Sequence, residues 1–320
     1  MIDINIIHET AGRLMAKAAI EIPDDYHAGL KKAASQEDGD LASFVLEAML
    51  QNYEAAKEDR RAMCADTGVP RWYVKLGNEA HILGGAVALE DVLRRATAEA
   101  TQNVPLRPNR VHPLWRTDHN NNCGINAPEI EYAFEPNSDW IDITTVHKGG
   151  LFGTDYRMLF PGDGIDGIKR FFIDSLVAFG KRGLACQPAI IGVGLGGSKD
   201  TTMLLGKRAA CLRVVGDKNP DPKVAALEDE LVKLDINILL ISWRSFSGNK
   251  GKPTEKNLYH DAKEIIKWLE RLGLNKNDII LYGESLGTGV ATELASQNNF
   301  AGIILESPFT SIADAAKIYY

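Results

Sequence analysis

The stretch IILYGESLGTGVATELASQNNFAGIILE, residues 279–306, decides the fold class, because it alternates strand, helix and strand without interruption. Its apolar run 279–283 predicts a buried strand that leads into a sharp turn and a helix over residues 286–296. Residues 302–306 predict the next strand. Continuous apolar strands that alternate with helices are typical of a parallel, doubly wound sheet.

The same alternation extends upstream to about residue 235. INILLISW, residues 236–243, predicts another buried strand, and residues 255–272 predict an amphipathic helix. Before that point the pattern changes abruptly. We therefore expect two domains, a helix-rich α/β domain over residues 1–234 and a partial, doubly wound parallel sheet over residues 235–320.

The first domain combines helices with a few strands, so the chain as a whole falls in a mixed α/β class. Its elements are expected as helices over residues 9–58, 86–100, 165–180 and 198–210, and as strands at 129–134, 140–147 and 188–192. Residues 64–75 are expected to be extended. Residues 103–127, rich in Pro, Asn and His, predict a long loop of the kind that is functional or disordered.

Composition and charge exclude several classes of function. The 320 residues are 45% hydrophobic and 25% charged, as in globular soluble proteins, and carry a net charge of −7. That charge argues against nucleic acid or an acidic membrane as partner, so an anionic substrate requires a locally basic pocket. Neither a signal peptide nor a membrane-spanning apolar run is visible, and four cysteines do not form a disulfide framework. We expect a cytoplasmic protein.

One chemical motif lies in the second domain. Gly283-Glu284-Ser285-Leu286-Gly287 is a G-x-S-x-G sequence between a strand and a helix, the context of a nucleophile elbow with Ser285 as nucleophile. Hydrolases of this type place an acid and then a histidine after the serine. The last histidine of this chain is His260, which precedes Ser285. The sequence therefore predicts a catalytic serine whose triad is incomplete in this chain.

A glycine-rich segment in the first domain permits two interpretations. Residues 192–197, GVGLGG, satisfy G-x-G-x-x-G between a predicted strand and a helix, and Asp217 lies 20 residues further on. This arrangement is found in dinucleotide sites. The same glycines are also consistent with a helix N-terminus that binds a substrate anion.

Two cysteines are candidate metal ligands. Cys64 and Asp66 lie two residues apart in MCADTG, on one tight turn, and Cys186 directly precedes a predicted buried strand. Iron–sulfur clusters are held by cysteine thiolates that are often distant in sequence. Core packing of both thiols remains the alternative on spacing alone.

Several passages of residues 1–234 resemble the α subunit of the class I fumarase and L(+)-tartrate dehydratase group of iron–sulfur hydro-lyases. The matching passages, in the order of that family, are PDDYHAGL, MCADTGVP, HKGG, FGKRGLACQP and GVGLGGSKDTTMLLGKRAACLRVVGDKNPDP. The resemblance implies a hydro-lyase α-type domain. It therefore also favours the anion-binding interpretation of the glycine-rich segment.

The resemblance implies a [4Fe-4S] cluster with Cys64 and Cys186 as two of its three cysteine ligands. The family's third cysteine lies in a segment that this chain replaces from about residue 235. No cysteine follows Cys211, and neither Cys211 nor Cys123 falls at the family's position. The third ligand is thus missing from its expected place.

The resemblance also implies a substrate site. Asp66 corresponds to the acidic residue next to the family's first cluster cysteine, and Lys148, Gly149 and Gly150 correspond to its glycine-rich substrate loop. We take Asp66 as a candidate for part of the acid–base work, the alternative being a turn aspartate that caps its own backbone. Thr67 is a further candidate for substrate binding. An iron without a protein ligand acts as a Lewis acid on the departing hydroxyl, while a base removes the proton next to a carboxylate. The implied substrate is a small dicarboxylate, the implied partner is a β-type dehydratase subunit, and a homo-oligomer is a further possibility.

Residues 235–320 resemble a fragment of the Bem46-like α/β-hydrolases, through SGNKGKPTEKNLYHDAKEIIKWL, NDIILYGESLGTGVA and FAGIILESPFTS. We therefore predict an iron–sulfur hydro-lyase α subunit that acts on a substrate such as fumarate, malate or tartrate. Two alternatives stay open. One is a serine hydrolase that acts through Ser285, and the other is a chimeric or truncated chain with neither activity.

Overall fold

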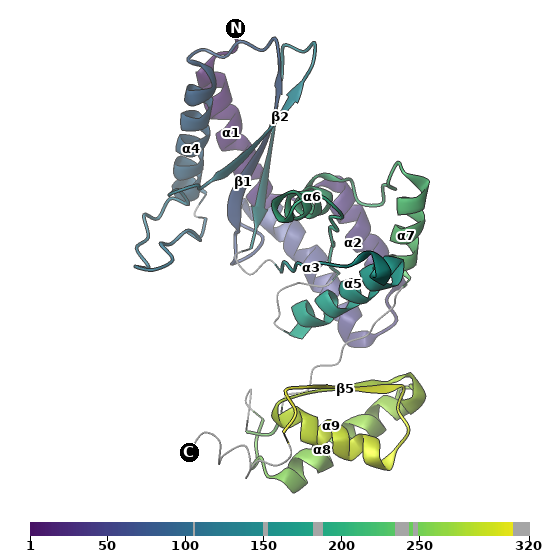
Figure 1. Ribbon diagram of the computed structural model, residues 1–320. Coiled ribbons are helices and arrows are strands. Elements are labelled where there is room, and N and C mark those ends of the chain that lie inside the picture. Colours follow the sequence, from purple (N-terminus) through teal and green to yellow (C-terminus); the bar gives the residue numbers. More distant parts are fainter. Residues whose placement is uncertain (105, 150–152, 182–187, 234–242, 246–248, 310–320) are drawn as a thin grey trace. The chain divides into compact units, whose positions relative to one another are not determined.

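The computed structural model describes residues 1–104, 106–149, 153–181, 188–233, 243–245 and 249–309. The chain forms two compact units, Met1–Ile236 and Asn237–Tyr320, shown in Figure 1. We describe each unit by itself. Both contain helices and strands, so the predicted mixed α/β class is confirmed.

The first unit, which we call unit 1, is mostly helical. Its elements are α1 (Ile4–Ile20), α2 (Asp24–Gln36), α3 (Asp40–Asp59), β1 (Val69–Gly77), α4 (Gly85–Asn103), β2 (Glu129–Glu135), β3 (Ile141–Lys148), the short 3-10 helix η1 (Pro161–Asp163), α5 (Gly164–Lys181), α6 (Lys199–Leu212) and α7 (Pro222–Val232). The helices and the strand pair expected from sequence are present, with shifts of a few residues at their ends.

The sheet of unit 1 has β1 as its central strand. The strand order is β2-β1-β3, with β2 parallel and β3 antiparallel to β1. Sequence alone predicted only an extended segment at the position of β1. The register pairs Trp72 with Ile130 on one side and Thr145 on the other.

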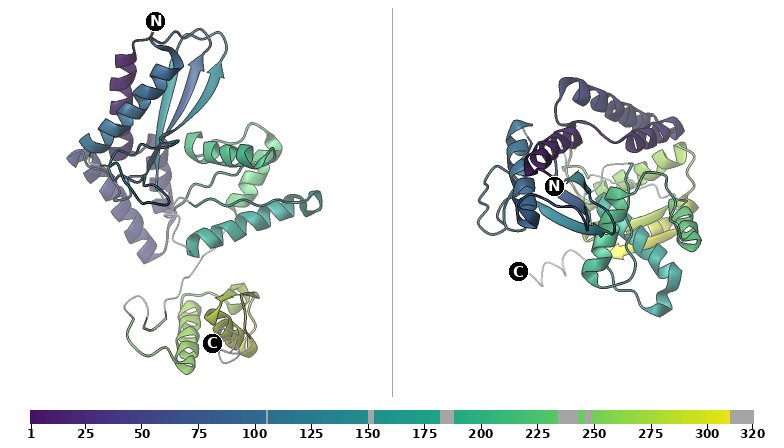
Figure 2. Two further views of the ribbon diagram at one scale, coloured as in Figure 1. Left: turned by 60° about the vertical axis from the view of Figure 1, so that its left-hand side comes forward. Right: turned by 90° about the horizontal axis from the view of Figure 1, so that it is seen from above.

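One face of this sheet forms the hydrophobic core of unit 1. Side chains alternate along a strand, so Trp72 and Val74 of β1 point to the same face. That face packs against α1 and α4, which lie side by side in Figures 1 and 2. Trp72 is fully buried, and its indole N–H donates to the Thr97 hydroxyl of α4 at 3.0 Å.

The opposite face of the sheet is polar, although it is also covered. Arg71 and Tyr73 of β1 are 9% and 7% exposed. The guanidinium of Arg71 donates to Glu131 of β2 at 3.0 Å, and Arg208 of α6 forms an ion pair with the same carboxylate. Helix α6 is therefore linked to this face by charged side chains.

The predicted strand at 188–192 is wrong. The structure gives these residues no strand assignment, and α6 follows from Lys199. A side-chain carbon on Gly192 would collide with the Gly206 carbonyl, and one on Gly194 with the Thr202 carbonyl. The glycines thus allow this segment to lie directly against α6, so it packs on a helix and pairs with no strand among the described residues.

The second unit, unit 2, contains α8 (Glu255–Arg271), the 3-10 helix η2 (Lys276–Asp278), β4 (Ile280–Glu284), α9 (Leu286–Gln297) and β5 (Gly302–Glu306). Strands β4 and β5 are parallel, as predicted, and α8, α9 and β4 share one apolar cluster. The predicted strand 236–243 lies, up to residue 242, outside the described residues. Several apolar side chains of the two strands are exposed, namely Ile280, Ile303, Ile304 and Leu305.

Among the helices that the structure describes, none is long and apolar enough to cross a membrane.

The buried pair of Trp72 and Thr97 gives a test of the core. Thr97→Val keeps the shape but leaves the indole N–H buried without an acceptor, which costs about 1–3 kcal/mol. Denaturation by urea should show this loss as a lower midpoint in Thr97→Val. An unchanged midpoint in Thr97→Val would show that the hydrogen bond does not stabilise the core.

Candidate functional site

The loop that carries Cys64 and Asp66 lies against the end of β3. Register pairs Val69, the first residue of β1, with Lys148, the last residue of β3. Gly68 has φ +90°, and a side-chain carbon there would lie 2.6 Å from the Lys148 nitrogen. The close approach of these two segments therefore requires glycine at this position.

Asp66 lies between the long loop, which carries Asn109, and the end of β3, next to which Gly149 lies. Its Oδ1 accepts a hydrogen bond from the Asn109 side-chain amide at 3.1 Å. Its Oδ2 lies 2.7 Å from the point where a Cβ of Gly149 would stand. Thr67, next in the chain, accepts the Arg107 N–H through its hydroxyl at 2.8 Å. The absence of a side chain at Gly149 leaves the room that the carboxylate occupies.

Predicted site residues thus lie close together in this part of unit 1. The loop bears Cys64, Asp66 and Thr67, and the end of β3 bears Lys148 and Gly149. The thiol of Cys64 is exposed. Gly150 and Cys186 lie outside the described residues.

Sequence reasoning missed Asn109, the residue that holds Asp66. The backbone N–H of Asn109 donates to Oδ1 of Asn122 at 2.8 Å. Asn122 is 1% exposed, and its side-chain amide donates to Thr101 of α4 and to the Arg107 carbonyl. The long loop predicted at 103–127 is thus anchored by a buried asparagine. The only signal in the sequence was the polar composition of the loop.

A cavity of about 280 Å³ opens beside this cluster. Its lining includes Val69, Arg71, Tyr73, Arg110, Glu129, Lys148, Gly149, Thr154, Lys207 and Cys211. Among these described residues, four are cationic, namely Arg71, Arg110, Lys148 and Lys207, and Glu129 is the one carboxylate. The lining reaches Gly149, which touches Asp66. This is the locally basic pocket that an acidic protein needs in order to bind an anion.

The charged groups of the cavity wall are held in place by one another. Arg71 forms ion pairs with Glu129 and Glu131, and its guanidinium lies 5.2 Å from the centre of the Tyr73 ring. Glu131 also pairs with Arg208. Burial raises the pKa of Tyr73 to about 12, so its hydroxyl keeps its proton at neutral pH.

The cysteines other than Cys64 and Cys186 have separate surroundings. Cys211 of α6 is half-buried at the cavity wall, where burial raises its pKa and the nearby Lys148 partly opposes that rise. The Cys123 thiol lies 3.3 Å from the Arg94 carbonyl, and burial raises its pKa as well. In the described ranges, no group of three metal-ligating side chains converges. The exposed Cys64 thiol beside Asp66 fits one ligand position of a thiolate-held cluster.

His147 is a second residue that sequence reasoning did not assign to the site. It directly precedes Lys148 on β3, and its buried ring makes no hydrogen bond of good geometry among the described residues, although it lies close to the Thr67 backbone. Burial lowers its pKa to about 4, and the backbone of Thr67 opposes this only in part. The ring is therefore neutral at pH 7.

Ser285 occupies the strained turn between β4 and α9. Its φ of 48° is positive, an unfavourable conformation for a residue with a side chain. Its N–H donates to the Glu306 carbonyl at 3.0 Å, and its own carbonyl accepts from the Thr288 N–H at 3.0 Å. The side chain is exposed. Its catalytic role stays a prediction.

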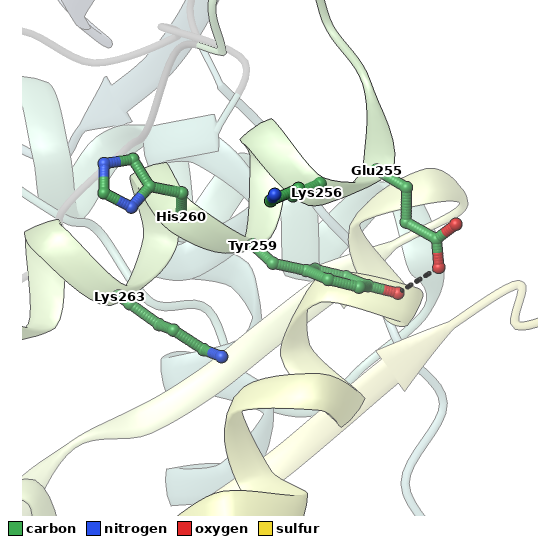
Figure 3. A pocket seen from close by; sticks show the side chains of 5 residues that line it. All are labelled: Glu255, Lys256, Tyr259, His260 and Lys263. Carbon is green, nitrogen blue, oxygen red and sulfur yellow. Dashed lines mark hydrogen bonds between the residues drawn. The ribbon is translucent and has the colours of Figure 1, made fainter.

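His260 lines a separate hollow on α8. Figure 3 shows this hollow with Glu255, Lys256, Tyr259 and Lys263, all from the same helix, and with the Tyr259 hydroxyl donating to Glu255 at 2.8 Å. His260 is exposed, and Ser285 does not line the hollow. The structure therefore shows no arrangement in which His260 serves as base for that serine.

By class, unit 1 is an α/β protein with a cavity lined by cationic side chains beside the loop of Cys64 and Asp66. Comparison with known proteins gives the family. Residues 8–249 match the fumarate hydratase (Fumerase) family, a range that covers most of unit 1 and the first residues of unit 2. The chain belongs to this family, and its function is that of a hydro-lyase.

Individual relatives agree with this assignment. The chain is 34% identical over 248 residues to the "Putative L(+)-tartrate dehydratase subunit alpha" of Methanocaldococcus jannaschii, a match that spans 76% of this chain and 85% of the relative. It is 29% identical over 249 residues to the L(+)-tartrate dehydratase subunit alpha of Escherichia coli K12, across 77% and 80% of the two chains. The protein of the same name from Shigella boydii shows the same values.

The buried His147 predicts a dependence of stability on pH. Its pKa in the folded state lies below the ordinary 6.5, so the unfolded state binds the proton more readily. The stabilisation is complete above pH 6.5 and is lost as the pH falls toward 4. Between pH 7 and pH 5 the free energy of unfolding should fall by about 2 kcal/mol through this residue.

Chemical denaturation at the two pH values measures the effect, and His147→Leu should lose that part of the dependence. The control is His260→Gln, since His260 is exposed. Equal pH dependence in wild type and His147→Leu would contradict the prediction.

The incomplete triad predicts that Ser285 is not activated. A fluorophosphonate probe should fail to label the full chain, because no histidine follows Ser285 in the sequence and His260 lies in a separate hollow. Labelling that disappears in Ser285→Ala would show that the serine is activated after all.

Proposed function

We propose that this chain is the α subunit of a hydro-lyase that adds or removes water on a small dicarboxylate of the fumarate, malate or tartrate type. The observation that carries the proposal is the cationic cavity next to Asp66. The names of the relatives support it, because they are subunits alpha of L(+)-tartrate dehydratase. A chain of this kind works with a β-type subunit, which we propose as its partner.

The cavity binds the two carboxylates of the substrate. Lys148 from β3, Lys207 from α6 and Arg110 from the long loop approach it from three segments. Their positive charges offset the loss of hydration that a dianion suffers on leaving water. A volume of about 280 Å³ suits a ligand smaller than a nucleotide.

We propose that Cys64 and Cys186 hold the iron–sulfur cluster that the family implies. The cluster type, [4Fe-4S], and the source of the third ligand are part of this proposal. Bound there, the cluster supplies a Lewis acid for the hydroxyl group that is expelled or added. The exposure of the Cys64 thiol, which leaves it accessible to a cluster, supports the assignment.

Asp66 is the proposed acid–base residue. The hydrogen bond from Asn109 to Oδ1 holds the carboxylate in one orientation. Oδ2 lies beside Gly149, and Gly149 lines the cavity. We propose that the substrate binds in this cavity, within reach of that oxygen. Thr67, Gly149 and Gly150 complete the proposed contacts with substrate.

For residues 235–320 we propose an incomplete α/β-hydrolase segment of the Bem46-like type. The parallel β4–β5 pair and the positive φ of Ser285 support this assignment. The comparisons favour the hydro-lyase function over serine hydrolysis.

Asp66→Asn tests the acid–base role. The variant keeps the shape and the contact with Asn109 but removes the base, so turnover of the diacid by the chain with its β-type partner should fall 10²- to 10⁴-fold. Asp118→Asn is the control, because Asp118 is an exposed residue of the long loop that carries Asn109, and its carboxylate accepts the N–H of its neighbour Asn120. Equal loss in both variants, or no loss in Asp66→Asn, would contradict the role.

Cys64→Ser tests the cluster. Protein prepared without oxygen should be brown in the wild type and should lose iron and sulfide in Cys64→Ser. Cys123→Ser should retain them, because that thiol contacts the Arg94 carbonyl. A colourless wild type without iron and sulfide would refute the proposed cofactor.

A further inference from the structure

Tyr73 is a buried side chain whose polar group the fold leaves unused. It lies on the polar face of β1 and lines the cavity, yet it is only 7% exposed. Its hydroxyl makes no hydrogen bond of good geometry within the described part of the chain, although the Cys211 thiol lies close enough to interact with it. A thiol is a weak acceptor, so the hydroxyl is poorly satisfied, and such a group in a cavity wall points to a ligand that completes it.

The neighbours of Tyr73 explain why the protein itself does not satisfy the hydroxyl. In the register, Tyr73 stands beside Glu131 of β2, whose carboxylate already accepts from Arg71 and Arg208. The next side chain across the cavity wall, Cys211 of α6, is a neutral thiol and a weak acceptor. Nε of Arg71 is a second buried donor without a partner on the same face.

The cavity offers positive charge around this hydroxyl. Lys148 and Lys207 line the same space, and both lie near enough to Cys211 to affect its pKa. A ligand that satisfies all these groups must present several acceptor oxygens and negative charge. A carboxylate has both properties.

We propose that the Tyr73 hydroxyl donates a hydrogen bond to one carboxylate of the bound diacid and is a specificity-determining residue of this site. The inference rests on the proposed function, since it uses the same cavity and the same class of substrate. The high pKa of the phenol, about 12, keeps it a donor throughout the working range of pH.

Tyr73→Phe removes only the hydroxyl and gives a direct test. Calorimetric titration of the full chain with succinate, a diacid that cannot undergo the reaction, should show binding about 10- to 100-fold weaker in the variant, as expected for loss of a hydrogen bond to a charged group. Without ligand, the midpoint of thermal unfolding should stay unchanged or rise, because the removed hydroxyl has no strong acceptor beside it.

The matched control is Tyr132→Phe. Tyr132 of β2 pairs with Val74 on the core face, and its hydroxyl lies 3.4 Å from Glu90, so succinate binding should be unaffected.

The outcomes separate this inference from the proposed function. If the wild type binds succinate and Tyr73→Phe binds it equally well, the role of Tyr73 is wrong while the proposed site stands. If the wild type itself binds no succinate, the proposed site fails. If Tyr73→Phe lowers both affinity and the unfolding midpoint, the hydroxyl has a structural partner and the inference is overturned.

Discussion

The alternation of side chains along β1 is the constraint on which unit 1 depends. Trp72 and Val74 point into the core against α1 and α4, and Arg71 and Tyr73 point to the cavity on the other face. A shift of one residue in the register would place the arginine in the apolar core and the tryptophan in the cavity. Burial of Trp72 therefore fixes the core and, at the same time, the direction of the side chains that line the cavity.

The site is assembled where the start of β1 meets the end of β3. Two glycines make this possible, because Gly68 lets its loop approach the backbone of Lys148 and Gly149 leaves space for the Asp66 carboxylate. The long loop contributes Asn109, whose side chain donates to Asp66. Asn122 of the same loop accepts the Asn109 N–H and donates to Thr101 of α4, so it anchors the loop to that helix. Residues from three distant parts of the sequence thus surround one carboxylate and one cationic cavity.

The sequence predicted what depends on local pattern. The helices, the strand pair of unit 1 and the strand–turn–helix around Ser285 follow from periodicity and turn residues, and the resemblance to hydro-lyases identified the loop of Cys64 and Asp66. It did not predict the central position of β1, because strand pairing is decided by contacts between distant segments. The strand expected at 188–192 fails for a related reason, since its glycines serve contact with α6. Tyr73 has no sequence signal at all, because only the structure shows that its buried hydroxyl lacks a strong acceptor.

The central claim is that the cavity of unit 1 binds a small dianion through Lys148 and Lys207. The most direct measurement compares succinate with butyrate, which has the same number of carbons and one carboxylate less, by calorimetric titration of the full chain. Succinate should bind at least tenfold more tightly, and Lys148→Met and Lys207→Met should each reduce that preference. Equal affinity for the two acids, or a preference that survives both substitutions, would contradict the claim.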